Sequence, residues 1–165
     1  MTSELLTNLL TDLAATAPAQ MLKASFWVYP LVNAGHILGI ALLVGAIAVL
    51  DLRLLGLFRK VPAAALAAGA VPVAAIGLFV ATVTGFLLFA VKPLDYAGSS
   101  LFLGKLAVIA AAVLNLILVR RNARWRRIAQ GGPVEPDGAL RLAGLLSLAL
   151  WTAALVLGRL VGYFL

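Results

Sequence analysis

Four long apolar runs divide the chain, and the short segments between them hold most of its charged and turn-forming residues. Each run is long enough to cross a hydrocarbon layer of about 30 Å, which takes about 20 helical residues. Pro72 fits the first turn of its helix, where a missing amide proton does no harm, and the preceding run 63–70 is a short additional helix or an extension of this one. The glycines and prolines of 131–138 mark a loop. The pattern predicts four transmembrane helices, at 31–50, 72–91, 101–119 and 139–164.

A different pattern comes before these runs. Over residues 3–15, leucines recur at helical spacing on one face, and polar side chains lie largely opposite. This periodicity predicts an amphipathic helix lying at the membrane surface. Membrane-surface helices usually carry basic residues, which this segment lacks, so the surface of a partner protein is an alternative docking site.

The composition supports a membrane protein. Hydrophobic residues make up 64% of the 165 residues and charged residues 12%, which is more apolar surface than one soluble core buries. The predicted fold class is therefore all-α: an integral membrane four-helix bundle with an N-terminal interfacial amphipathic helix, in one domain spanning 1–165. The absence of cysteine excludes disulfides, thiolate metal sites and thiol nucleophiles.

The basic residues gather in two of the connections. On the side of the membrane opposite to these connections, the only basic residues outside the apolar runs are Lys23 and Lys92. By the positive-inside rule, the two basic connections lie in the cytoplasm and both termini lie outside, which predicts a multi-pass protein of the bacterial inner membrane. The net charge of +7 then needs no nucleic acid to explain it, although a docking patch for anionic lipid or protein is an alternative. The basic residues of the two connections are Arg53, Arg59 and Lys60 after the first run, and Arg120, Arg121, Arg124, Arg126 and Arg127 after the third.

His36 is the only histidine, and it lies six residues inside the first apolar run. An ionisable side chain inside a membrane helix costs roughly 2.5 to 3.5 kcal/mol on insertion scales, so it marks a candidate functional site. An imidazole nitrogen can ligate haem iron or another metal. The structural alternative is a histidine that hydrogen-bonds across helices, helped by Asn33 one turn earlier.

The predicted topology places Gly85, Lys105 and Arg159 near the depth of His36, roughly 6 to 9 Å below the outer surface, and Gly39 flanks the histidine on its own helix. Lys105 and Arg159 can pair with haem propionates or another anionic head group, and Gly85 and Gly39 can admit a flat macrocycle. The candidate cofactor site is therefore His36 as the ligand of a b-type haem, with Lys105, Arg159, Gly39 and Gly85 around it. Alternatively, the two cations snorkel to the surface and the glycines serve helix packing.

Several segments of the chain resemble one known family. They begin with SFWVYPLV at 25–32, GHILG at 35–39 and DLRLLG at 51–56, and continue at 84–89, at 102–106 with Asn115, and at 147–151 followed by 158–159. The sequence resembles the DUF6644 type of small bacterial membrane proteins over nearly its whole length. That resemblance implies the fold but no activity, because the family has no settled one.

A more distant resemblance concerns the histidine itself. His36 followed by Gly45 and Arg53, with Lys105-Leu106 opening the third run, is similar to the haem-associated protoporphyrinogen oxidase family of bacteria and to the copper-resistance D membrane domain. The first similarity implies that His36 and Lys105 serve haem binding and activity, which makes porphyrinogen oxidation an alternative function. Copper export has less support, because Cu(I) prefers sulfur ligands and the spans contain none.

These observations lead to two main hypotheses. In the first, a haem held by His36 transfers electrons between membrane quinone and an outer-facing redox partner. One histidine leaves such a haem five-coordinate, with another second ligand, or between two copies in a homo-oligomer. In the second, the protein is a non-catalytic membrane subunit or a lipid- or small-molecule-binding protein with a structural His36.

The remaining polar residues are expected to have structural roles. Asp51 is expected to form an interfacial salt bridge with Arg120 or Arg141. Asn115 is expected to hydrogen-bond to a neighbouring helix. No carboxylate is expected inside the bundle, so hydrolytic catalysis also lacks support.

Overall fold

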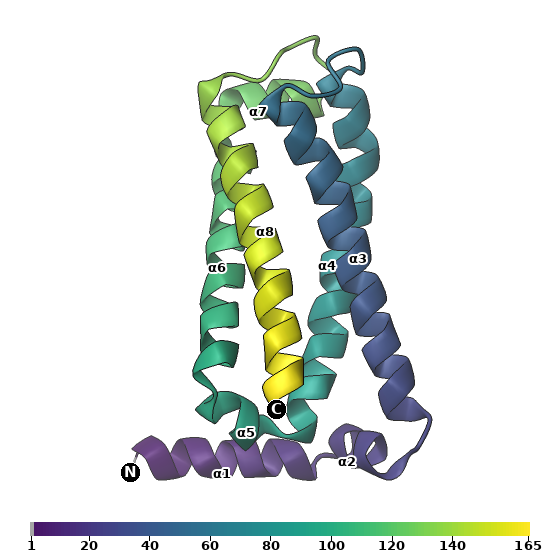
Figure 1. The fold of residues 1–165 in the computed structure, drawn as a ribbon, viewed down its shortest axis with the longest axis vertical. Coiled ribbons are helices and arrows are strands. Elements are labelled where there is room, and N and C mark those ends of the chain that lie inside the picture. The colour runs from purple at the N-terminus through teal and green to yellow at the C-terminus, as the bar shows by residue number, and fades with distance from the viewer. Residues whose placement is uncertain (1) are drawn as a thin grey trace.

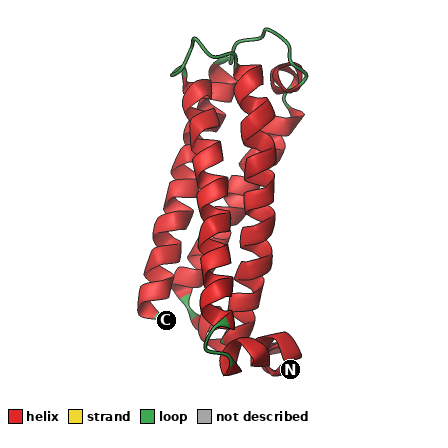
Figure 2. Cartoon of the chain, turned by 90° about the vertical axis from the view of Figure 1, so that its right-hand side faces the viewer, coloured by secondary structure: helices red, strands yellow, loops and turns green. Residues whose placement is uncertain are grey.

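A computed structural model describes residues 2–165, and all of its elements in that range are helices. Four long helices run side by side, three short ones lie at one end of them and one lies at the other (Figure 1). Figure 2 shows the same bundle from the side. The helices are α1 (Thr2–Ala15), α2 (Ala17–Ala24), α3 (Val28–Leu55), α4 (Ala63–Val91), α5 (Pro93–Gly98), α6 (Ser100–Arg121), α7 (Ala123–Ala129) and α8 (Gly138–Phe164). The all-α four-helix bundle is confirmed.

Helices α3, α4, α6 and α8 are each long and apolar enough to cross a membrane, so the protein is a multi-pass membrane protein. All four extend beyond the predicted runs, α3 and α4 the most. Helix α4 begins at Ala63, so the run 63–70 is an extension of this helix, as one of the two alternatives had it. Pro72 therefore lies inside the helix, and its predicted place in the first turn was wrong. Pro62 precedes the first turn instead, and its carbonyl accepts hydrogen bonds from Ala65 and Leu66.

The two ends of the bundle differ. We call the end that carries the connections 56–62 and 122–137 the basic end, and the end formed by α1, α2, α5 and the C-terminal residue the terminal end (Figure 1). Helix α1 lies across the terminal end and contacts α2, α4 and α5. Its side chains Leu5, Leu6 and Leu9 stay exposed, as expected of a face that meets lipid.

Helices α3 and α4 form the closest pair of the bundle, and two glycines make their approach possible. A Cβ atom on Gly39 would lie 2.6 Å from the backbone nitrogen of Ala81, and one on Gly77 would lie 2.5 Å from the backbone nitrogen of Leu43. Small residues at such crossings let membrane helices touch backbone to backbone. The α3–α4 pair is therefore a rigid unit on which the His36 side chain is placed.

Two apolar clusters of buried residues hold the four helices together. The first, around Leu54, Trp125 and Ile128, lies at the basic end, and the second, around Leu43 and Trp151, lies near the middle of the bundle. His36 belongs to neither cluster. Helices α3 and α8 lie closer together at the basic end than at the terminal end (Figure 1).

Candidate functional site

His36 lies on α3 near the terminal end, and its imidazole is directed at α4. Its Nδ1 atom is 3.1 Å from the hydroxyl oxygen of Thr84. The Thr84 hydroxyl also lies 2.6 Å from the carbonyl oxygen of Val80, to which it donates. A hydroxyl has one proton to donate, so Thr84 accepts its other hydrogen bond from His36. This chain of bonds assigns the imidazole proton to Nδ1.

The other ring nitrogen, Nε2, then carries a lone pair. The hydrogen bond to Thr84 does not use this lone pair. The backbone of Ala81 on α4 is a second hydrogen-bond neighbour of the ring. A histidine whose one nitrogen donates to a neighbour while the other keeps its lone pair is arranged as metal-ligating histidines are. The same nitrogen can also accept a proton. Nε2 is thus a Lewis-basic atom within the first membrane helix.

Protein atoms fill the space beside both glycines that were proposed for the site. A Cβ on Gly85 would lie 2.9 Å from Cε1 of His36, so the imidazole itself fills the space at that glycine. The space at Gly39 is filled by the backbone of α4. Both glycines therefore serve packing between α3 and α4, and any flat ligand of His36 has to bind beside them.

Of the two cations proposed for the site, only Lys105 lies near His36. Lys105 is half-buried, and its charge is close enough to interact electrostatically with His36. Its ammonium nitrogen lies 4.7 Å from the ring centroid of Phe102, a cation–π distance. The Phe102 ring in turn stacks on Phe89 of α4, with 5.5 Å between the centroids. Arg159 is exposed, and no ion pair joins it to another described residue.

The structural role suggested for His36, a hydrogen bond across helices helped by Asn33, is confirmed only for the hydrogen bond. The imidazole does hydrogen-bond across helices, but its partner is Thr84 on α4, while Asn33 is exposed on the surface of α3. The sequence contains no signal that singles out Thr84 among the threonines, because the rotation of α4 about its axis decides which one faces α3. Asn115 donates to the carbonyl of Ala143 on α8 at 3.0 Å, as predicted.

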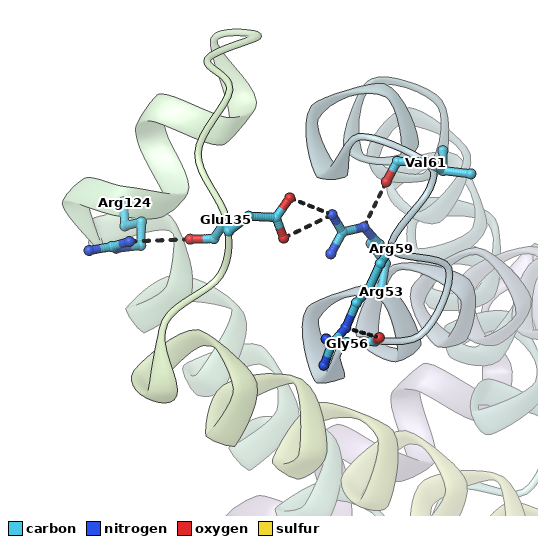
Figure 3. Close-up of polar contacts among 6 residues, drawn as sticks. All are labelled: Arg53, Gly56, Arg59, Val61, Arg124 and Glu135. Atoms are coloured by element: carbon cyan, nitrogen blue, oxygen red, sulfur yellow. Dashed lines mark hydrogen bonds and ion pairs between the residues drawn. The ribbon is translucent and has the colours of Figure 1, made fainter.

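The basic end holds a second polar site, which the sequence did not reveal. The Arg53 side chain is only 1% exposed and is held by three hydrogen bonds (Figure 3). Its Nε donates to the carbonyl of Val61 at 2.7 Å, and its Nη2 donates to both carboxylate oxygens of Glu135, at 2.8 and 3.0 Å. The hydrogen bond from the Arg53 guanidinium holds the pKa of Glu135 below its usual value. Arg124 secures the same loop, donating to the Glu135 carbonyl at 3.3 Å.

Asp51 differs most from its prediction. The residue is 4% exposed, with the Ser147 hydroxyl of α8 as its polar neighbour. Within the described chain it forms no salt bridge with Arg120 or Arg141, so that prediction was wrong, as was the expectation of no carboxylate inside the bundle. The cause is a close helix contact: a Cβ on Gly144 of α8 would lie 3.3 Å from the carbonyl oxygen of Asp51. Helix α8 therefore covers the carboxylate.

The described residues contain no group of three or more histidine, cysteine, aspartate or glutamate side chains arranged to hold a metal ion. A metal at this site would have to arrive within a cofactor that brings most of its own ligands, because His36 supplies one nitrogen atom. Comparison with protein-family models, with curated proteins and with solved structures gives no match to this chain.

Proposed function

We propose that this protein is a membrane-embedded haem-binding subunit that takes part in electron transfer, with Nε2 of His36 as an axial ligand of a b-type haem. The observation that carries the proposal is the hydrogen bond between His36 and Thr84. This bond sets the tautomer and orients the ring, as the outer partners of ligating histidines do. His36 supplies one nitrogen ligand, which suits haem because the porphyrin ring itself supplies four of the ligands of the iron.

The charges near His36 support an anionic cofactor. Lys105 is half-buried and interacts electrostatically with His36, and a buried cation gains from an anionic partner such as a propionate. Gly158 of α8 lies next to the Lys105 side chain, and the neighbouring Arg159 is exposed. The Arg159 side chain would therefore reach only the outer edge of such a cofactor. When bound, haem supplies one-electron redox chemistry.

The proposal includes an orientation. The arginines of 120–127 lie at the basic end, so by the positive-inside rule this end faces the cytoplasm of a bacterial inner membrane. His36 then lies near the outer leaflet, where electrons would pass between membrane quinone and an outer-facing partner. The sixth coordination position would stay open or be filled by a second copy of the chain, because His36 is the only histidine.

The test is a reduced-minus-oxidised absorbance spectrum of detergent-purified protein expressed with ample haem, together with a pyridine haemochrome assay. Stoichiometric b-type signal is expected in the wild type and in Asn33→Ala, which removes an exposed polar residue of the same helix. The signal should be absent in His36→Ala. A colourless wild-type protein, or a signal that survives in His36→Ala, would rule out the proposal.

A second candidate is a non-catalytic membrane subunit in which His36 is a packing element. It is favoured by the fit of the imidazole against Gly85, with Cε1 only 2.9 Å from the position of a Cβ there. On this alternative the protein is colourless, and His36→Ala weakens the α3–α4 contact without loss of any cofactor. The same spectrum distinguishes the two candidates.

A further inference from the structure

The Asp51 carboxylate is enclosed between two helices at the basic end. It lies in the last two turns of α3, is 4% exposed, and has the Ser147 hydroxyl of α8 as its polar neighbour. Its Oδ2 atom is buried and has no hydrogen-bond partner. Gly144 brings the backbone of α8 against the carbonyl of Asp51, where a Cβ would lie 3.3 Å from the carbonyl oxygen.

Among residues 2–165, no cation forms an ion pair with this carboxylate. Arg53 lies on the same helix, but its guanidinium is bound to Val61 and Glu135. On the helices packed against α3, Arg141 of α8 forms no ion pair with Asp51, and α4 carries no titratable side chain. An ionised carboxylate buried without a cation is far more costly than a neutral acid with one unmet hydrogen bond. The neutral form is therefore the one that this environment favours.

We propose that Asp51 is a proton-binding site, occupied at neutral pH, whose ligand is a proton and not a metal cation. A hard cation such as Mg²⁺ or Ca²⁺ needs about six or more oxygen ligands, whereas the environment here supplies the carboxylate and one hydroxyl. Release of the proton would place an unpaired charge between α3 and α8 beside Gly144. Occupancy of the site is thus linked to the packing of these two helices.

The first test is infrared spectroscopy of the purified full-length protein at neutral pH. The carbonyl stretch of a protonated carboxylic acid is expected in the wild type and should vanish in Asp51→Asn. The control is Glu135→Gln, which alters an exposed, ion-paired carboxylate and should leave the band unchanged. A wild-type spectrum without the band, or a band that survives in Asp51→Asn, would overturn the proposal.

The second test needs no substitution, so it holds even if Asp51→Asn fails to fold. Dicyclohexylcarbodiimide, an apolar reagent for protonated carboxyl groups, is added to the wild-type protein in lipid vesicles, and the label is mapped by mass spectrometry. We expect the label on Asp51 and not on Glu135, at the same rate with and without sodium. An unlabelled Asp51, or one that sodium protects, would contradict a proton site. Neither test depends on haem, because a folded Asp51→Asn protein should keep any His36-dependent spectrum.

Discussion

The two ends of the bundle treat a polar side chain inside the membrane domain in opposite ways. Arg53 at the basic end donates three hydrogen bonds, to Val61 and to both oxygens of Glu135, and it lies beside a buried apolar cluster. His36 at the terminal end has one side-chain partner, Thr84, with the backbone of Ala81 beside it, and lies outside both clusters. A polar side chain that is held by several hydrogen bonds stabilises the fold, whereas a ring nitrogen that keeps its lone pair is available to a ligand.

The largest expected effect of this difference is on cofactor binding. His36→Ala should remove the whole b-type absorbance, because it removes the only histidine nitrogen in the chain. Arg53→Met, at the opposite end, should keep that absorbance in the protein that folds. The measurement is the haemochrome content per mole of purified protein. Equal losses in the two variants would mean that haem content reports folding and not ligation.

For the free energy of unfolding, we expect Arg53→Met to have the larger effect and His36→Ala the smaller one. Arg53→Met keeps the apolar volume but loses bonds from a buried cation, which should lower the free energy of unfolding by about 2 to 3 kcal/mol. His36→Ala loses one neutral hydrogen bond and should cost about 1 kcal/mol in protein without cofactor. Denaturant unfolding in detergent, followed by circular dichroism, measures both values. The control Arg59→Met removes only a bond to Gly56 three residues away and should change stability by less than about 0.5 kcal/mol.

A smaller change tests the position of the imidazole. Gly85→Ala places a methyl group 2.9 Å from Cε1 of His36, so the ring must shift, and we expect this shift to disturb its bond to Thr84. Loss of such an outer-shell bond typically lowers metal affinity by about 10- to 100-fold, and haem titration of the apoprotein should show a decrease of that order. The matched control is Gly45→Ala on α3, where a Cβ meets nothing within 4 Å. An unchanged affinity in Gly85→Ala would show that the ring position does not matter.

The smallest expected effect concerns pH at the basic end. Arg53 lowers the pKa of Glu135 below its usual value of 4.5. The folded protein thus binds this proton less readily than the unfolded chain. The stabilisation is therefore complete above the usual value and is lost as the pH falls through the lowered pKa. Thermal unfolding between about pH 6 and pH 3 should show a modest decrease that is absent in Glu135→Gln. A decrease of the same size in both proteins would assign it to other carboxylates.

The two ends also differ in how well the sequence anticipated them. His36 stood out because a single histidine in an apolar run is costly in lipid, and Lys105 was placed near it by depth alone. Arg53 was counted only as a basic residue of a connection, and its partner Glu135 is 82 positions away. Asp51 was expected at the membrane surface, because hydropathy does not reveal that Gly144 draws α8 over it.

The sequence by itself determined that this is a membrane protein with four spanning helices, because hydropathy over about 20 residues is a local property of the chain. The position of Pro72 was misjudged because the helix start depends on Pro62, ahead of the apolar run. The tertiary structure alone decided that Thr84 orients His36, that the imidazole fills the space at Gly85, and that Asp51 is enclosed by α8. These contacts depend on how each helix is rotated and paired, which small residues and a few interhelical bonds decide and which the apolar pattern does not encode.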